Sequence, residues 1–311
     1  MGVVFIQDEV LPDNQTTRRQ LIFLSLAFMW FFVFLFFLLF RADKGTVKRL
    51  GALSSTVSLL FLAEIGFIWS LELKTRTYTS TRNLLLNETA VDQLLVPQVK
   101  LSAKLNQKPP LFVPTGVYIQ SLYFTSYNNV FVTGYIWQEY HEEIHDELER
   151  GFILPDAIDA NNLKMTEAYR HKEDDLEVIG WYVEATLRQD FDFSNYPFDY
   201  KDVKIRLLHL DFNRRELNRQ VILVPDLEGY EVIDPRTKPG VDKDIVLGNW
   251  NLSDSFFEYK FKTYDTNLGI KSNLFKTNFP ELHFTIVLQR YFIGPLISRV
   301  GPLFVVITGC N

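Results

Sequence analysis

Hydrophobic positions are most concentrated in one run near the start of the chain. Residues Leu21–Phe40 include no charged side chain, and Ser25 is the only polar one among them. A helix rises about 1.5 Å per residue, so about 20 apolar residues cross the hydrocarbon core of a bilayer. The run therefore predicts a transmembrane helix. A cleaved signal peptide is the alternative, although its apolar core is shorter and ends in small residues, whereas Leu38–Phe40 is bulky.

Two further apolar segments extend this pattern. Leu50–Trp69 begins with small residues, which let helices approach closely, and predicts a second helix paired with the first. Its Glu64 is expected to reach the lipid headgroups beside Trp69; a buried functional carboxylate is the alternative. The segment 291–311 is apolar but is interrupted by two prolines and an arginine. It is interpreted as the start of a third transmembrane helix, apparently truncated.

The cations between the first two segments predict an orientation. Four Lys or Arg residues lie between positions 41 and 49, and the positive-inside rule assigns them to the cytoplasm. Arg18 and Arg19, before the first segment, oppose this assignment. We therefore expect a multi-pass protein of a bacterial inner membrane, with residues 72–290 on the periplasmic or extracellular side and the lipid bilayer as one partner.

Beyond residue 112 the pattern changes to short apolar runs separated by Asn, Asp, Gly and Pro, which is typical of an all-β domain. In Pro280–Arg290 every second residue is Leu, Phe or Ile, so one face of this strand is expected in the core and the other largely in water. Six further runs are predicted as strands: 117–123, 130–140, 178–187, 203–207, 221–224 and 257–261. Seven strands are enough for a sandwich.

The expected fold class is thus a membrane protein. It has an all-β sandwich outer domain, an immunoglobulin-like Greek key, with two N-terminal transmembrane helices and the start of a third. The expected domains are an N-terminal tail (1–20), the helix pair (21–71), a linker with a short helix (72–112), the β-sandwich ligand-binding domain (113–290) and the third helix start (291–311).

Composition and charge exclude several classes of protein. Cys310 is the only cysteine in 311 residues, so neither an intrachain disulfide nor a Cys-based zinc cluster can form. The net charge is −6. Nucleic-acid binding needs a basic surface that neutralises phosphates, so no nucleic-acid partner is expected.

One motif suggests metal chemistry. His141–His145 matches HExxH, which on a helix would place two imidazoles around zinc with Glu142 as general base. Its surroundings are charged on every side, and no third ligand is evident, so we expect no metal site. From residue 139 to 175 there are twelve Asp or Glu against four Lys or Arg, which leaves open a cation-collecting stretch or a solvated loop. The sequence shows no recognisable set of a nucleophile, a general base and a residue that orients the base. Neither enzyme activity nor a cofactor is therefore expected.

The order of the predicted strands and the turn between two of them carry a resemblance. Residues 181–208, and within them Phe193–Asp199 with its Tyr-Pro-Phe-Asp sequence, resemble the signature-loop region of pentameric ligand-gated ion channels (Cys-loop receptors) in their cysteine-free prokaryotic form. Residues 115–121 and 134–140 look like the first two strands of that family. Trp250 looks like the start of its ninth strand, and 282–290 like its tenth. The resemblance covers about residues 113–305.

This resemblance implies roles for particular residues. Its coupling residues, which would pass a ligand-induced change onward, correspond to Arg188, Pro197, Phe198, Asp199 and Arg290. An Asp and an Arg at the ends of two strands can form a charge-assisted pair, although such a pair can also serve the fold alone. By position, Trp137, Tyr140 and Tyr264 would contribute to ligand binding, yet aromatic residues of this kind are often core residues.

This chain departs from the family's pattern in three respects. The family has no helix pair before its outer domain, the acidic stretch 139–175 is longer than expected, and no pore-lining helix is present in the sequence. We expect a receptor that binds a small-molecule ligand and controls ion conduction, as a homo-oligomer that is pentameric by resemblance only. The alternative is a membrane-anchored ligand sensor that signals to a cytoplasmic partner without a pore. A zinc metalloprotease is the distant alternative.

Overall fold

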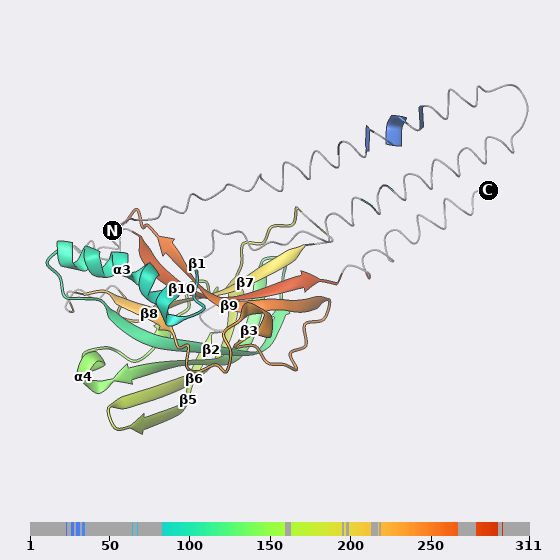
Figure 1. Cartoon of the computed structure of the whole chain (residues 1–311). Helices are drawn as coiled ribbons and strands as arrows, with labels where there is room; N and C mark the ends of the chain where they lie inside the picture. The colour runs from blue at the N-terminus through green and yellow to red at the C-terminus, as the bar shows by residue number, and fades with distance from the viewer. Residues whose placement is uncertain are drawn as a thin grey trace, which may run out of the picture. The chain divides into compact units, whose positions relative to one another are not determined.

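The computed structural model of the chain describes residues 83–158, 163–194, 196, 199–212, 217, 219–266, 278–291 and 294, together with a few scattered positions between 23 and 67. The chain forms two compact units, Met1–Tyr78 and Thr79–Asn311. All strands described belong to the second unit, which we call the β-rich unit (Figure 1).

The structure contradicts the expectation of a membrane-spanning protein. Among the described residues, no helix is long and apolar enough to cross a membrane. A crossing helix needs about 20 apolar residues, whereas α3 (Glu88–Lys104) has 17 residues and carries charges of both signs. The fold class with two N-terminal transmembrane helices and a third helix start, and the multi-pass location in a bacterial inner membrane, are corrected accordingly. Most of residues 21–71 and 291–311, on which that expectation depended, lie outside the described residues.

The β-rich unit contains two five-stranded sheets. In order across the first, here sheet A, are β1 (Asn83–Leu84), β9 (Trp250–Lys262), β10 (Phe279–Arg290), β7 (Tyr200–His209) and β4 (Phe152–Ile153). In order across the second, here sheet B, are β5 (Lys164–Glu173), β6 (Leu176–Arg188), β3 (Asn129–His141), β2 (Leu111–Phe124) and β8 (Val221–Pro225). Short helices α4 (Glu142–His145) and η2 (Pro235–Thr237) lie between strands.

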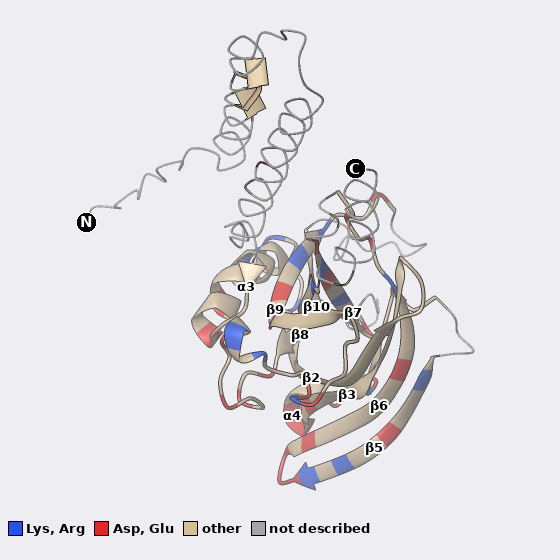
Figure 2. Cartoon of the chain, turned by 90° about the vertical axis from the view of Figure 1, so that its right-hand side faces the viewer, with Lys and Arg blue, Asp and Glu red and all other residues tan. Residues whose placement is uncertain are grey.

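All seven strands expected from alternation are confirmed, as β2, β3, β6, β7, β8, β9 and β10. The all-β character expected for residues 113–290 therefore agrees with the two sheets. The pairing is not that of a purely antiparallel Greek key, because β8 runs parallel to β2 over Leu111–Thr115. The acidic stretch contributes β5, which pairs with β6 and has charged residues of both signs spaced along it (Figure 2).

Strand β10 is central to sheet A and is buried on both faces. It pairs antiparallel with β9 on one side and β7 on the other. Leu282, Phe284 and Ile286 point into one core shared by the two sheets. Contrary to the expectation of a wet second face, Glu281 and His283 on the other side are buried as well. Polar groups in such a position require partners.

Helix α3 lies in the stretch expected as a linker with a short helix. The Asn87 side chain caps it by accepting a hydrogen bond from Ala90 N at 2.8 Å. Val91, Leu95 and Gln98 are buried at helical spacing, and Gln98 Nε2 donates to Asn278 O just before β10. The helix is thereby joined to the strands of its own unit.

Gly134 in β3 offers a test of this packing. A Cβ at this position would lie 2.1 Å from the carbonyl oxygen of Tyr118 on β2, where the β2–β3 register shifts. Paired backbone cannot move aside as a flexible side chain can. We expect Gly134→Ala to destabilise the fold by about 1–3 kcal/mol, seen as a lower midpoint of thermal unfolding. An unchanged midpoint would contradict the close approach of β2 and β3.

Candidate functional site

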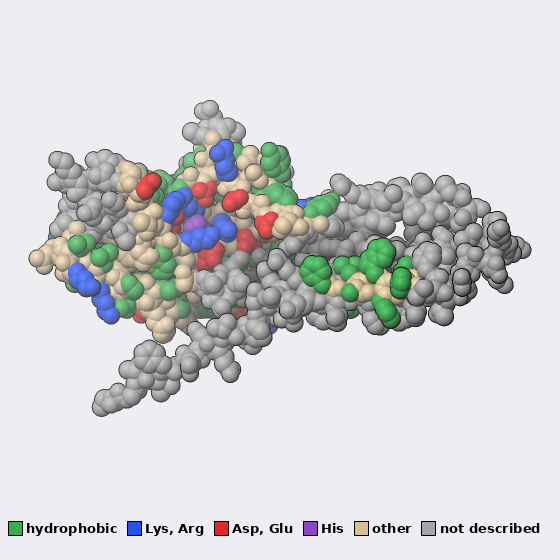
Figure 3. All heavy atoms as spheres, turned by 90° about the horizontal axis from the view of Figure 1, so that it is seen from above, with side chains coloured by type: hydrophobic (Ala, Val, Ile, Leu, Met, Phe, Trp, Pro, Cys, Tyr) green, Lys and Arg blue, Asp and Glu red, His purple; other side chains and the backbone are tan. Residues whose placement is uncertain are grey.

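A pocket of about 960 Å³ lies over the outer face of sheet A. Alternation places it there: Val203 and Ile205 of β7 enter the core, so Lys204 and Arg206 point to the opposite face. The segment 155–158 and the corner at 188–190 complete its wall. In a space-filling view, Lys, Arg, Asp, Glu and His side chains gather on one face of the β-rich unit (Figure 3).

Cations outnumber anions in this pocket. Asp156, Asp190 and Glu281 are the acidic lining residues, and the basic ones are Arg188, Lys204, Arg206, Lys260 and Lys262. The whole chain, by contrast, has a net charge of −6. A basic pocket in an acidic protein favours an anionic ligand.

An ion-pair cluster forms the floor of the pocket. Arg206 Nε lies 2.8 Å from Glu281 Oε2, and Arg206 Nη2 donates to Glu281 Oε1 at 2.8 Å. Tyr264 OH donates to Glu281 Oε1 and accepts from Arg206 Nη2 at 3.0 Å. Burial would raise the pKa of Glu281, but the neighbouring His283, Tyr264 and Arg206 lower it to about 2. Glu281 is therefore a carboxylate whose charge Arg206 balances.

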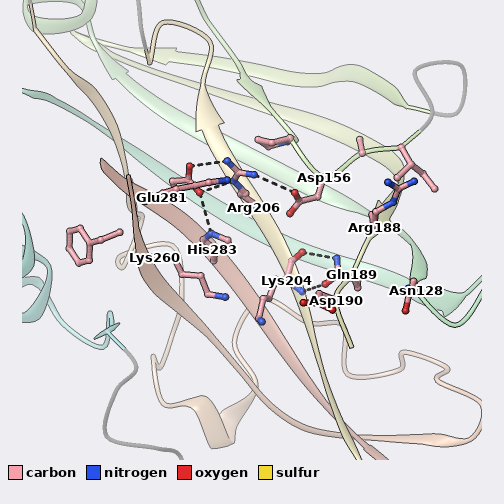
Figure 4. A pocket seen from close by; sticks show the side chains of 15 residues that line it. Asn128, Asp156, Arg188, Gln189, Asp190, Lys204, Arg206, Lys260, Glu281 and His283 are labelled. Carbon is pink, nitrogen blue, oxygen red and sulfur yellow. Dashed lines mark hydrogen bonds and ion pairs between the residues drawn. The ribbon is translucent and has the colours of Figure 1, made fainter. Parts of the chain in front are cut away.

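His283 is a buried polar residue of the pocket whose ring makes no hydrogen bond among the described residues. It is 5% exposed, and neither ring nitrogen has a hydrogen-bond partner among the described residues. Its Nε2 lies 3.8 Å from Glu281 Oε2, too far for a hydrogen bond. Burial lowers the pKa of His283, so the ring is neutral at pH 7 and offers one donor and one acceptor. Figure 4 shows Lys204, Lys260 and His283 directed toward the same space from three strands.

A second charged cluster, here called the Asp199 cluster, joins the start of β7 to the end of β10. Arg290 Nε lies 2.5 Å from Asp199 Oδ1 and Arg290 Nη2 lies 3.1 Å from Oδ2, a bidentate pair. Lys201 Nζ lies 3.0 Å from the same Oδ2. Asp199 is 2% exposed and Lys201 1%. One buried carboxylate therefore forms ion pairs with two cations.

Backbone and ring contacts compensate the surplus positive charge of the Asp199 cluster. Lys201 Nζ donates to Asp192 O at 2.5 Å and lies 3.5 Å from the Phe193 ring centre. The Arg290 guanidinium lies 4.2 Å from the Trp250 ring centre. Burial alone would raise the pKa of Asp199, but the hydrogen bonds from Arg290 and Lys201 outweigh it and hold that pKa below its ordinary value.

The residues expected to couple do not all come together. Asp199 and Arg290 are paired, whereas Arg188 lines the pocket, with its backbone N–H donating to Asp156 O at 2.8 Å. Pro197 and Phe198 lie outside the described residues.

Of the residues expected to bind ligand, Tyr264 reaches the ion-pair cluster of the pocket, but Trp137 and Tyr140 do not line it. Trp137 Nε1 donates to Asp226 Oδ2 at 2.6 Å. Tyr140 is fully buried and donates to Gln138 Oε1 at 2.7 Å. Its role is in the core.

Sequence reasoning missed Arg206, Glu281 and His283. Their only signal was a run of polar residues at every second position of β7 and β10, which alternation assigned to solvent. The burial of these three side chains on the outer face of sheet A could not be recognised without knowing which segments cover that face.

The HExxH motif does not form one helical face. His141 ends β3, whereas Glu142–His145 form α4. His145 Nδ1 accepts a hydrogen bond from His141 N at 3.0 Å. Among the described residues, no three His, Cys, Asp or Glu are grouped so as to hold a metal ion.

Comparisons of the sequence with known protein families and with curated proteins found no match. The fold and the site themselves define a class, namely a two-sheet β protein with a cation-rich pocket on the outer face of one sheet.

The Asp199 cluster predicts a large stability effect. Asp199→Asn keeps the shape of the side chain but leaves Lys201 and Arg290 without their counterion, so we expect a loss of about 3–5 kcal/mol in the free energy of unfolding. Lys201→Met keeps the Asp199–Arg290 pair and should cost less. Urea denaturation measures both. Equal stability of Asp199→Asn and the wild type would show that the pair is not formed in solution.

His145 and His209 predict a pH dependence of stability. Burial lowers the pKa of each to about 4 in the folded state, against about 6.5 when unfolded. The unfolded chain therefore takes up more protons between these values, and stability is lost as pH falls from about 6.5 toward 4, by on the order of 3 kcal/mol per histidine.

A substitution of His209 tests how much of this loss of stability at low pH comes from its imidazole. His209 Nε2 lies 3.3 Å from Tyr140 OH, a contact that the amide of His209→Gln can replace without titrating. Thermal unfolding at pH 6.5 and pH 5 should show a shallower decline for this variant. A decline as steep as in the wild type would rule out His209 as a source.

Proposed function

We propose that the β-rich unit is a ligand sensor. A small anionic molecule binds in the pocket over sheet A, and the Asp199 cluster at the far ends of β7 and β10 responds. The observation that carries the proposal is His283, a buried ring beside several cations. Neither of its nitrogens makes a hydrogen bond among the described residues, and its nearest charged neighbour, Glu281 Oε2, lies 3.8 Å from Nε2. Buried polar groups are ordinarily satisfied, so an unsatisfied one facing a cavity marks a place for a ligand.

The chemistry of the lining favours a carboxylate or phosphate group. Lys204 and Lys260 supply ammonium donors, and neutral His283 supplies one ring N–H. Glu281 is already balanced by Arg206, so it does not oppose the ligand's charge fully. A volume near 960 Å³ lies at the upper end for small-molecule sites.

The connection from pocket to Asp199 cluster runs along two paired strands. β7 and β10 are in register from Leu207 and Leu282 to Tyr200 and Gln289. Arg290 lies seven positions after His283 along β10, roughly 23 Å at about 3.3 Å per residue. A ligand shifts the geometry at the far end only if it binds one arrangement of these strands more tightly than another.

The resemblance to the outer domains of pentameric ligand-gated channels supports sensing, since the residues that resemble coupling residues there include Asp199 and Arg290. We further propose that several copies of the chain assemble into a homo-oligomer. Light scattering of the full chain measures its oligomeric state. No membrane location is part of the proposal.

The pocket is tested by calorimetric titration of the full chain with succinate, glutamate and inorganic phosphate. At least one should bind, and Lys204→Gln combined with His283→Leu should weaken it tenfold or more, since hydrogen bonds to charged groups contribute about 1.5–3 kcal/mol each. Lys243→Gln, an exposed lysine outside the pocket, is the matched control.

Hydrogen exchange then tests coupling. The Arg290 N–H donates to Asp199 O at 3.1 Å, and its exchange rate should change on ligand binding. Binding equally weakened by Lys243→Gln, or no binding of any of the three anions, would contradict the anion pocket. Binding without any change at Arg290 would contradict the sensor.

A further inference from the structure

A second cavity, of about 530 Å³, lies between α3 and the β2–β8 edge of sheet B; we call it the α3 groove. Its walls are largely apolar, formed by Val91, Leu95 and Val99 of α3, Phe112 of β2, Val224 of β8 and Leu227. Val96, also in the lining, remains 42% exposed. Val99, a wall residue on the same helix, is 41% exposed. Apolar side chains left open beside a cavity indicate a place where something else is buried.

The charge of the α3 groove is of one sign. Five carboxylates line it, from Glu88, Asp92, Glu139, Asp226 and Glu228, and no Lys, Arg or His is among its described lining residues. Burial, followed by the charges of Asp226 and Glu228, raises the pKa of Glu139. Like charges gathered beside an apolar wall repel one another unless a cation neutralises them.

One of these carboxylates is held in a fixed position. Asp226 Oδ2 accepts from Trp137 Nε1 at 2.6 Å, and Asp226 Oδ1 accepts from Gly229 N at 3.0 Å. The Trp137 ring in turn lies against Tyr230, with ring centres 5.7 Å apart. A carboxylate oriented in advance in this way loses little freedom when a cation binds.

We propose that the α3 groove binds a small organic cation with an apolar body, such as an alkylammonium. The apolar walls take the hydrocarbon part, and the ammonium group lies on the acidic side of the groove, where Glu139 and Asp226 are close enough to interact electrostatically. Inorganic metal ions fit poorly, because hard cations need several oxygen ligands close together and no such group is found among the described residues. The site is independent of the anion pocket over sheet A.

The test is calorimetric titration of the full chain with octylammonium, kept below its micelle concentration, and with octanol as the uncharged counterpart. Octylammonium should bind at least about tenfold more tightly than octanol, which corresponds to about 1.4 kcal/mol. Asp92→Asn with Glu139→Gln should remove most of that preference. Val96→Gln, at a half-exposed helical position, should weaken both probes alike.

The matched control is Glu143→Gln, which removes an exposed carboxylate outside the groove and should leave both affinities unchanged. Circular dichroism and thermal unfolding establish that each variant is folded. Equal affinity for octanol and octylammonium, or an unchanged preference in Asp92→Asn with Glu139→Gln, would overturn the proposal. Binding of a lysine-rich peptide but not of octylammonium would also overturn it, in favour of a protein partner.

Discussion

The structure depends on burying β10 on both of its faces. Toward the core, Leu282, Phe284 and Ile286 are fully buried opposite β7 partners of the same kind. Toward the other face, Glu281 is paired with Arg206, and Thr285 Oγ1 donates to Glu258 Oε1 at 2.9 Å. Polar groups removed from water must be bonded, so this second face consists of matched pairs. His283 makes no hydrogen bond among the described residues, and it lines the pocket.

The same constraint connects the two charged clusters of sheet A. Ion pairs shielded from water gain strength from the low local dielectric but lose hydration, so their geometry must be good to be tolerated. Asp199 meets this requirement through a bidentate pair with Arg290 and an ion pair with Lys201. The Lys201 ammonium also contacts an aromatic ring and a backbone carbonyl. Because β7 and β10 contribute to both clusters, a displacement of either strand would alter two sets of ion pairs at once. This shared pair of strands is the physical basis of the proposal that the pocket and the Asp199 cluster are coupled.

Much of the β architecture could be predicted from local pattern, and much of the site could not. The strands β2, β3, β6, β7, β8, β9 and β10 were found because each alternates or is continuously apolar. β5 was missed because all but one of its residues are exposed, so no alternation marks it. The membrane assignment is contradicted by the finding that no helix among the described residues is long and apolar enough to cross a membrane. Trp137 and Tyr140 were assigned to ligand binding by position, but their hydrogen bonds are to Asp226 and Gln138 within the protein.

By itself the sequence determined most of the segments that become strands, because alternation or a continuous apolar run is a local property that these strands carry in their own residues. It also singled out Asp199 and Arg290 as partners, 91 positions apart, through a resemblance in their flanking residues. Only the tertiary structure decided which polar side chains lose contact with water. That outcome depends on the segments that cover each face of a sheet, and those segments are distant in the chain, so no local pattern records it. For this reason Glu281 and His283 read as solvent-facing in the sequence and lie at the floor of a pocket in the fold.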